Sequence, residues 1–515
     1  MKRREMLQGA GATLAICAAG AVPARASVRS GATRTPDFDG YIQDVLAVGD
    51  VPGASVVVVH QGSTVFSRAY GINRLGQADR VDLDTVFDTA SLTKSFTAAA
   101  IASLVDEGRM AWDDPVRKHL PTLEFPNPYL TAELTVRDLL CHRTGLSNLD
   151  SAWYLTGISR NDVLGLVKNL EVSAPLRTKW LYSNIGFTIA GEAAASAAGM
   201  SWERLVTERL LTPLGMRRST ANFDAVPTLG NFASPHAIIG TNQVVIPRET
   251  QRASTAPAGG VQSCATDIAT WMNFHLGDGT HAGRRILSVA SMAEMHSPQI
   301  VVPTTAAFRA ARQLRYFAGY GLGWQVFDYR GRPYIWHTGG GDGQRAIMAL
   351  LPDQSLGVAV LVNSKSAPIQ SCLAIVSHIF DHYLGEQPAQ DYLDDVRTAF
   401  DRSNAERDTE LAARAASRDS SKPPNAPMSA YVGRYRDRLG LIVDVTEARG
   451  DLTMRYGGGE LAILDHWRDD LFFTRWQNPM HSQNWGAFLS FSLNASGIAD
   501  RLHFEPDQPV DAIRI

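Results

Sequence analysis

Ser91 and Lys94, a serine and a lysine three positions apart, are the residues of this 515-residue chain whose types and spacing most clearly point to chemistry. Residues 91–107 read as a helix that ends at Gly108, so the two side chains would share one helix face. A lysine placed there can help turn a weakly acidic hydroxyl into a nucleophile. Ser91 would also lie among the free N–H groups of the helix N-terminus, which can hold an oxyanion. By itself this spacing is weak evidence for a catalytic pair, because a serine that caps a helix and an exposed lysine give the same pattern.

Two further motifs strengthen the indication that Ser91 and Lys94 are catalytic. Tyr182 and Asn184 form a Tyr-x-Asn triplet, and His337 begins the run His-Thr-Gly-Gly. In this order and at similar separations, the three motifs resemble those of the serine β-lactamase and penicillin-binding protein family, with its class C β-lactamase, D-aminopeptidase and esterase relatives. The resemblance extends from about residue 37 to residue 385 and includes Leu-Leu-Cys-His-Arg-Thr-Gly-Leu at 139–146, which is similar to a turn of that family.

The residue types give each motif position a role in acyl transfer. Ser91 is the expected nucleophile, and Lys94 and Tyr182 are the expected proton-transfer pair. Lys94 would form hydrogen bonds to both Ser91 and Tyr182. The charge of Lys94 would favour the tyrosinate form of Tyr182. Because coupled groups titrate as a pair, the sequence leaves open which of the two is the base. The amide of Asn184 can orient Lys94 and bind a substrate carbonyl.

The third motif is expected to bind the substrate. The N–H groups of Ser91 and Gly340 would form an oxyanion hole, and Gly339 would let the strand edge approach the substrate. His337 stands where lactam-binding relatives usually present a cationic lysine, and a histidine is largely neutral at pH 7. This departure resembles D-aminopeptidases, amidases and some esterases. It argues against efficient β-lactam turnover or carboxypeptidation, while slow acylation remains compatible with it.

We expect neither a cofactor nor a metal ion. His378 and His382 have a spacing that can bind metal on a helix, but an ordinary helix surface explains them better. The sequence contains no His-x-His-x-Asp run of a metallo-β-lactamase and no Gly-x-Ser-x-Gly elbow of an α/β-hydrolase.

The order of strand and helix patterns predicts the fold class of residues 27–385. Two strand pairs lie at the two ends of this region, and mostly helical patterns lie between them. The expected strands are 52–60, 63–70, 345–351 and 356–363, and the expected helices include 202–211, 268–276 and 369–384. This order favours an α/β (α+β) fold of the β-lactamase and transpeptidase type, in which one antiparallel sheet is built from both chain ends beside a helical lobe. The site would lie at the junction of sheet and lobe.

A second, smaller domain is expected at residues 428–515. It would follow a linker at 386–427 that is charged, partly helical and Pro-rich at its end. Seven short strand patterns separated by Gly, Asn and Asp predict a small antiparallel β-barrel or sandwich. Their ranges are 431–435, 439–445, 452–456, 461–467, 471–476, 487–493 and 498–505. The domain resembles the lipocalin-like appendage of some relatives, with the run Tyr-Val-Gly-Arg-Tyr at 431–435 as its entry motif.

The first 26 residues read as an export signal. Basic residues 2–4 precede an apolar segment at 6–22, and Ala-Arg-Ala at 24–26 is a suitable cleavage site. The paired arginines resemble a twin-arginine signal, which predicts a periplasmic or secreted protein. The apolar segment is too short and too rich in Gly and Ala for a stable membrane anchor. Cys17 fits a lipoprotein cleavage box poorly.

The charge and the cysteine content of the chain argue against nucleic-acid binding and against a fold held by disulfide bonds. Cleavage after Ala26 removes four basic residues and one acidic residue, so the net charge changes from −3 to −6. A mildly acidic exported protein has no electrostatic basis for binding nucleic acid. The remaining cysteines, Cys141, Cys264 and Cys372, make no disulfide framework and read as small buried side chains, with one chance pair left open.

The sequence therefore predicts an exported serine hydrolase that cleaves amide or peptide bonds in a small-molecule or peptide substrate. Ester hydrolysis, weak β-lactamase or DD-carboxypeptidase activity at the same site are the alternatives, together with a non-catalytic penicillin-binding-type sensor. The intact Ser91, Lys94 and Tyr182 favour an enzyme over the sensor. The sequence also allows a homo-oligomer that forms through the C-terminal domain. The loops at 222–258 and 299–316 carry no pattern that identifies the acyl group or its stereochemistry.

Overall fold

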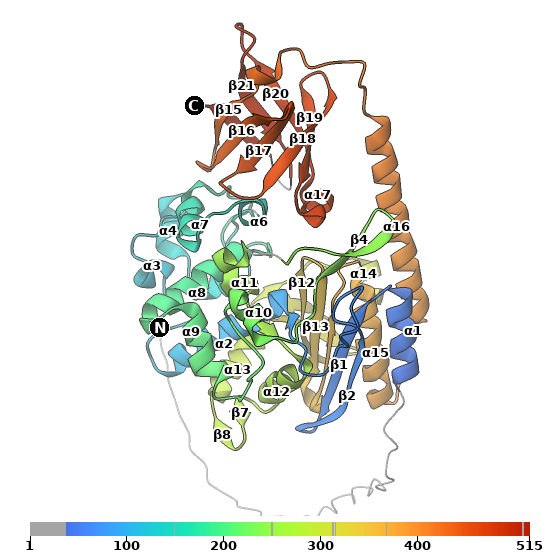
Figure 1. The fold of residues 1–515 in the computed structure, drawn as a ribbon. Coiled ribbons are helices and arrows are strands. Elements are labelled where there is room, and N and C mark those ends of the chain that lie inside the picture. The colour runs from blue at the N-terminus through green and yellow to red at the C-terminus, as the bar shows by residue number, and fades with distance from the viewer. Residues whose placement is uncertain are drawn as a thin grey trace, which may run out of the picture. The chain divides into compact units, whose positions relative to one another are not determined.

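The computed structural model describes residues 38–515 except 149, 249–250, 312–313, 315, 367 and 507–508. The predicted export signal at 1–26 lies outside the described residues. An eight-stranded antiparallel sheet forms the centre of the first domain (Figure 1), in the order β2-β1-β14-β13-β12-β11-β10-β9. These strands are β1 Gly53–His60, β2 Ser63–Gly71, β9 Ile300–Val301, β10 Ala318–Tyr320, β11 Gln325–Tyr329, β12 Arg332–Gly341, β13 Gln344–Leu351 and β14 Leu356–Val362.

The sheet joins the two ends of this domain, as the order of strand patterns predicts. β1 pairs with β14 in an antiparallel register that sets Ala54 opposite Val362 and His60 opposite Leu356. Both strands are continuous runs of small and branched apolar residues and are buried along almost their whole length. A strand that is covered on both faces needs such a run rather than an alternating pattern.

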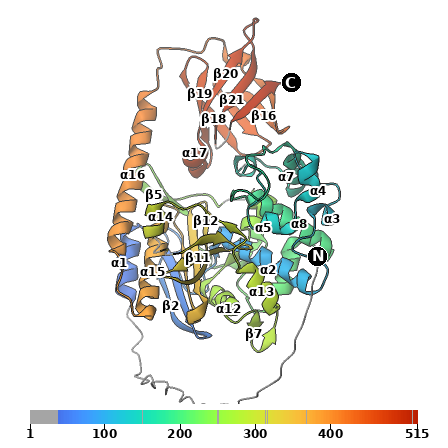
Figure 2. The same ribbon diagram turned by 180° about the vertical axis from the view of Figure 1, so that it is seen from behind.

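Helices cover both faces of the sheet (Figures 1 and 2). α15 Ile369–Leu384 packs on β13 and β14, beside α1 Asp39–Val48, whereas α12 Ala265–Leu276 packs on β1 and β14. The buried residues of α15 recur every three or four positions, at Cys372, Ile375, Val376, Ile379 and Phe380, which makes one apolar stripe against the sheet. The helix predicted at 369–384 is therefore confirmed in extent.

The helical lobe is inserted between β2 and β9. Its central helix, α2 Thr93–Asp106, is buried over its first twelve residues, and its alanines let α8 Asn184–Ala198 and α11 Ala256–Gly259 approach closely. The other helices between β2 and β10 are α3 Val116–His119, α4 Pro128–Glu133, α5 Val136–Leu140, α6 Ser151–Tyr154, α7 Arg160–Leu166, α9 Trp202–Val206, α10 Val226–Leu229, α13 Val289–Met295 and α14 Ala306–Ala311.

The C-terminal domain is a closed antiparallel barrel of eight strands. They are β15 Gly433–Asp437, β16 Ile442–Ala448, β17 Asp451–Tyr456, β18 Leu461–Arg468, β19 Leu471–Trp476, β20 Phe488–Leu493, β21 Ala499–Phe504 and β22 Val510–Arg514. β22 is not among the predicted strands, although its first four residues alternate between buried and exposed. β22 closes the barrel by pairing with β15, and closure removes the unpaired edges that a seven-stranded sheet would keep.

A 25-residue helix, α16 Tyr392–Ala416, occupies most of the stretch that we expected to link the domains. Its buried residues, Tyr392, Val396 and Ala399, all lie in its first turns. The Tyr392 hydroxyl donates a hydrogen bond of 2.7 Å to the buried carboxylate of Asp381 on α15. The rest of α16 is charged and largely exposed, so the helix is anchored to the first domain at its beginning.

Cys141, Cys264 and Cys372 are free and buried, which confirms their interpretation as small apolar residues. Burial raises the pKa of each thiol to about 12, so these thiols stay protonated at neutral pH. Over residues 38–515 as described, no helix combines the length and the apolar character that crossing a membrane requires.

Candidate active site

Ser91 lies in a single 3-10 turn, Ala90–Leu92, that leads directly into α2. Ala90 has a positive φ of 44°, a conformation that costs a residue with a side chain about 1–3 kcal/mol. The Ala90 N–H donates a hydrogen bond of 2.8 Å to Asp88 Oδ1, which helps to hold the turn. The α-helix thus begins two residues later than we predicted, and Ser91 lies in a strained entry turn with its side chain partly exposed.

The ammonium group of Lys94 is fully buried directly behind Ser91. Lys94 Nζ donates to Ser91 Oγ at 3.0 Å, to Asn184 Oδ1 at 2.8 Å and to the carbonyl oxygen of Ala258 at 2.9 Å. These three acceptors match the three N–H bonds of an ammonium group. Lys94 Nζ also lies 4.7 Å from the ring centroid of Tyr182, which is a cation–π contact. The hydrogen bond that the sequence predicts between Lys94 and the Tyr182 hydroxyl stays a prediction.

Tyr182 and Asn184 bring the second motif to the same place. The Tyr182 hydroxyl donates a hydrogen bond of 2.9 Å to Ser91 Oγ. Burial raises the pKa of Tyr182 above its ordinary value, Asp150 raises it further, and the hydrogen bond with Ser91 offsets only part of this rise. The phenol is therefore protonated at neutral pH. Asn184 begins α8 and is held at both ends of its amide, since Nδ2 donates to Asp150 Oδ1 at 3.0 Å while Oδ1 accepts from Lys94.

The two glycines of the third motif have different surroundings. A Cβ on Gly340 would meet nothing within 4 Å, and Gly340 lines the hollow in front of Ser91. A Cβ on Gly339 would lie 2.0 Å from the carbonyl oxygen of Thr89, in the segment that precedes the nucleophile. This glycine lets β12 approach the entry turn of Ser91. Its predicted role in the approach of a substrate to the strand stays a prediction.

His337 is buried, with 2 % of its surface exposed, and both of its ring nitrogens are engaged. Nδ1 lies 2.7 Å from the carbonyl oxygen of Thr338, so Nδ1 carries the proton and Nε2 accepts from the hydroxyl of Tyr320 at 2.9 Å. Burial, and then the charge of Lys94, lowers the pKa of His337 to about 3. His337 is therefore neutral, as predicted, but it lines no part of the hollow and has no free nitrogen for a substrate. His337 thus supports Tyr320 through a hydrogen bond, and its predicted contact with a substrate stays a prediction.

The hollow in front of Ser91 has a volume of about 50 Å³. It is lined by Ala90, Ser91, Trp153, Tyr154, Asn184, Thr255, Ala258, Gly259 and Gly340. None of these side chains carries a charge. Trp153, Tyr154 and Thr255 are not among the predicted site residues, because they belong to short segments without a motif or a recognisable period. A larger hollow of about 570 Å³ beside α1 and β2 contains none of the motif residues.

The turn that follows Gly340 is bonded to a histidine of the C-terminal domain. His481, on α17 Pro479–Trp485, has Nε2 2.9 Å from Asp342 Oδ2, and its Nδ1 contacts the carboxylate of Glu460. Lys365 Nζ lies 3.7 Å from the same Asp342 side chain. Burial alone would lower the pKa of His481, but the two carboxylates outweigh burial and raise it to about 9. His481 is therefore a cation at neutral pH.

Comparisons with protein families agree with this geometry. The Beta-lactamase family model matches residues 38–371. A second model, described only as a domain of unknown function, DUF3471, matches residues 417–514, which include the barrel.

The chain is also similar to curated proteins over most of its length. It is 27 % identical to an unguisins hydrolase of Aspergillus campestris, over 79 % of this chain and 76 % of the relative. It is 28 % identical to penicillin-binding protein 4 of Amycolatopsis lactamdurans, over 65 % of this chain and 86 % of the relative.

Solved structures with the same fold include the octameric penicillin-binding protein homologue from Pyrococcus abyssi, with a TM-score of 0.61 and 20 % identity over 92 % of this chain and 99 % of that one. They also include a class C β-lactamase from Rhodobacter sphaeroides, with a TM-score of 0.52 and 22 % identity over 66 % of this chain and 98 % of that one. At such identities the likeness concerns the fold.

The two glycines give a matched pair of variants. Gly339→Ala should lower the free energy of unfolding by about 1–3 kcal/mol, because its Cβ would press on the Thr89 carbonyl group and displace the strand or the Ser91 turn. Gly340→Ala should change the free energy of unfolding by less than about 0.5 kcal/mol, because its Cβ enters open space. Urea unfolding followed by fluorescence measures both values. Equal losses in the two variants would contradict the close contact.

His481 predicts a pH dependence of stability. Because its pKa rises from 6.5 to about 9 on folding, its ion pairs contribute fully below pH ~6.5, and the contribution is lost as pH rises through about 9. His481→Gln should therefore lower the free energy of unfolding by roughly 3 kcal/mol at pH 6, and by much less at pH 10. His503→Gln is the control, since His503 pairs with Asp511 on the barrel surface and should contribute less than about 1 kcal/mol. A His481 effect that is constant from pH 6 to pH 10 would exclude the ion pairs as its cause.

Proposed function

We propose that this chain, which belongs to the β-lactamase family of serine hydrolases, hydrolyses amide or peptide bonds through an acyl-enzyme on Ser91. One observation carries the proposal. Two hydrogen-bond donors of different character, the Lys94 ammonium and the Tyr182 phenol, both meet Ser91 Oγ within 3.0 Å. A serine that only capped a helix would need neither of them.

Before acylation the pair formed by Lys94 and Tyr182 releases one proton to solvent water. Ser91 Oγ then attacks the carbonyl carbon of the substrate, and its proton passes to the vacated position of the pair. The negative charge that develops on the carbonyl oxygen is held by the N–H groups of Ser91 and Gly340. The carbon–nitrogen bond then breaks as a proton from the pair reaches the leaving nitrogen. Water next attacks the acyl ester, loses its proton to the same pair and releases the acid, which restores Ser91.

The environment of Tyr182 supports its part in this sequence. The phenol is protonated in the free enzyme, so it can deliver a proton to the leaving nitrogen. Its ionised form is needed only briefly, and Lys94 Nζ, 4.7 Å from the ring centroid, is the positive charge that stabilises it. Lys94 and Tyr182 therefore act as one proton-transfer unit.

The uncharged wall of the hollow supports an amide or peptide substrate over a carboxylate-bearing lactam. The histidine at position 337 is neutral and has no free nitrogen, so the described residues of the wall offer no cation to attract a substrate carboxylate. The similarity to an unguisins hydrolase supports hydrolysis as the reaction. Trp153 and Tyr154 offer aromatic surface beside Ser91, which suits an apolar group next to the scissile bond.

We also propose that the protein works outside the cytoplasm, on the basis of the basic, apolar and Ala-Arg-Ala segments of residues 1–26. The mass of the mature protein should then correspond to an N-terminus at Ser27. Retention of Met1 in the exported fraction would contradict cleavage at this site.

Ser91→Ala should remove the covalent chemistry while keeping the fold, with a loss of roughly 10³-fold or more in turnover. A panel of p-nitroanilides of L- and D-amino acids, p-nitrophenyl esters and nitrocefin measures the activity. We expect the anilides to be turned over best. Intact-mass analysis after treatment with a fluorophosphonate should show one adduct on the natural protein and none on the variant. An adduct of equal yield on Ser91→Ala would eliminate Ser91 as the nucleophile.

Lys94→Ala and Tyr182→Phe should each reduce kcat/KM nearly as much as the double variant does, because both groups act on the same proton. Asn184→Ala should be milder, since it removes one of the three acceptors of Lys94 and leaves the phenol in place. A double-mutant cycle measures the coupling. Losses that multiply would mean that Lys94 and Tyr182 act independently.

A further inference from the structure

His142 holds the backbone on both sides of Tyr182. Its carbonyl oxygen accepts a hydrogen bond of 2.8 Å from the N–H of Leu181, and its ring Nδ1 accepts one of 3.0 Å from the N–H of Ser183. The imidazole ring lies 4.4 Å from the Tyr182 ring, centroid to centroid. One residue thus contacts the phenol and fixes the two peptide groups that flank it.

The protonation state of His142 follows from these bonds. A ring nitrogen that accepts from a backbone N–H carries a lone pair, so the proton of the neutral ring is on Nε2. His142 has no exposed surface, and burial, followed by the charges of Lys94 and His337, holds its pKa well below the ordinary value. His142 is therefore a neutral acceptor at neutral pH.

The other ring nitrogen of His142 indicates that packing alone does not explain this residue. Nε2 is buried and has no hydrogen-bond partner among the residues that the structure describes. A buried N–H without a partner destabilises the fold. A phenylalanine would fill a similar space without this cost, but it could not accept the Ser183 N–H. The acceptor at Nδ1 is thus what the histidine adds.

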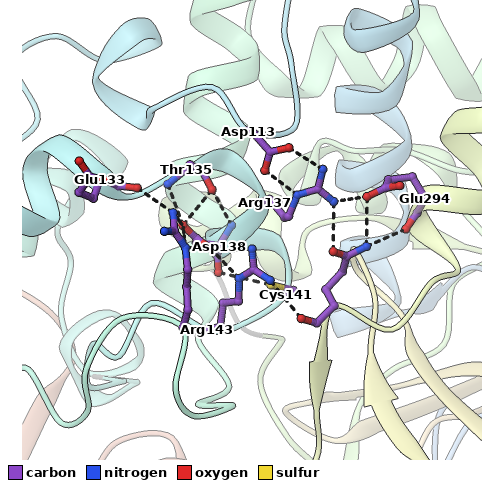
Figure 3. A network of polar contacts seen from close by, with 10 residues as sticks. Asp113, Glu133, Thr135, Arg137, Asp138, Cys141, Arg143 and Glu294 are labelled. Carbon is purple, nitrogen blue, oxygen red and sulfur yellow. Dashed lines mark hydrogen bonds and ion pairs between the residues drawn. The ribbon is translucent and has the colours of Figure 1, made fainter. Parts of the chain in front are cut away.

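An ionic network around the buried carboxylate of Asp138 supports the turn that carries His142, and Figure 3 shows Asp138 and Arg143 in this network. The carboxylate of Asp138, which has no exposed surface, accepts from Arg143 Nε at 2.6 Å and from Arg177 Nη2 at 2.8 Å. Burial alone would raise the pKa of Asp138, but hydrogen bonds from Arg177, Arg143 and Thr135 outweigh it and lower the pKa. Arg143 directly follows His142, and its carbonyl oxygen accepts from the N–H of Arg177 at 2.8 Å. The network therefore ties the His142 turn to the segment that leads to Tyr182.

His142 itself has a positive φ of 62°, which is uncommon for a residue with a side chain but which His, Asn and Asp adopt more often than others. That conformation lets one residue use its carbonyl group and its ring on the same neighbouring segment. The hydrogen bonds of His142 and the ionic network thus both act on the segment that carries Tyr182.

We propose that His142 is a positioning residue for Tyr182, a neutral double acceptor that holds the phenol at hydrogen-bond distance from Ser91. The inference rests on the proposed function, because it takes Tyr182 to transfer a proton. It adds a requirement that none of the three motifs contains: the Nδ1 acceptor of His142. A shift of about 1 Å in the phenol would be enough to reduce turnover strongly.

Two variants isolate the acceptor from the rest of the side chain. His142→Gly tolerates a positive φ and removes the ring, whereas His142→Asn also tolerates a positive φ and places Oδ1 near the position of Nδ1. With the best p-nitroanilide of the panel, or by the rate of Ser91 labelling with a fluorophosphonate, His142→Gly should lose roughly 10–100-fold in kcat or labelling rate, with KM changed less than about threefold. His142→Asn should recover most of that loss. An Asn variant as slow as the Gly variant would overturn the inference.

The same substitutions on a Tyr182→Phe background separate positioning from general damage. There His142→Gly should add less than about threefold, because the group that it positions is already absent. An equal loss on both backgrounds would overturn the role of His142 and leave the proposed function intact. Full activity of Tyr182→Phe alone would instead overturn the proposed function. His275→Asn is the matched control, since His275 is another buried histidine with a lowered pKa, lies outside the hollow, and should change stability but not kcat.

Discussion

The buried ammonium group of Lys94 is the constraint on which the rest of the site depends. A charge removed from water is costly unless every donor finds an acceptor. Lys94 meets this requirement through the Ser91 turn, the first residue of α8 and a carbonyl group of α11. The bonds that satisfy the charge also fix the position of these three segments around the nucleophile. The loss of any one acceptor would therefore disturb both the packing and the chemistry.

The charge of Lys94 also determines what the nearby imidazoles can do. Burial is the main cause of the low pKa values of His142 and His337, and Lys94 is the next cause for each. Both rings are neutral, so neither is suited to be the acid or the base. Each instead fixes geometry, His337 through Tyr320 and His142 through the backbone around Tyr182. A single positive charge remains at the centre, next to the only hydroxyl groups on which negative charge has to develop.

The sequence was sufficient where a local pattern carries the information. The spacing of Ser91 and Lys94 on one helix face and the apolar runs of β1 and β14 predicted real contacts, and the helix at 369–384 was found in full. It was insufficient where contacts are made between distant segments. Nothing near Gly339 indicates that its neighbour is Thr89, and the residues Trp153 and Tyr154 in the wall belong to no motif. The strand β22 is short, and its role in closing the barrel depends on its pairing with β15 rather than on its own pattern.

The position of Lys94 bears on which substrates the site can favour. Its ammonium group lies behind Ser91 and not in the wall of the hollow, which has no charged side chain. A charge in the wall would bind an anionic substrate before and during the reaction alike, and such uniform binding does not speed the chemical step. A charge behind the nucleophile acts mainly when negative charge develops on Ser91 or Tyr182. In the proposed mechanism, the electrostatics of this site thus act on the transition state of acyl transfer, and selection among substrates is left to the neutral and aromatic wall.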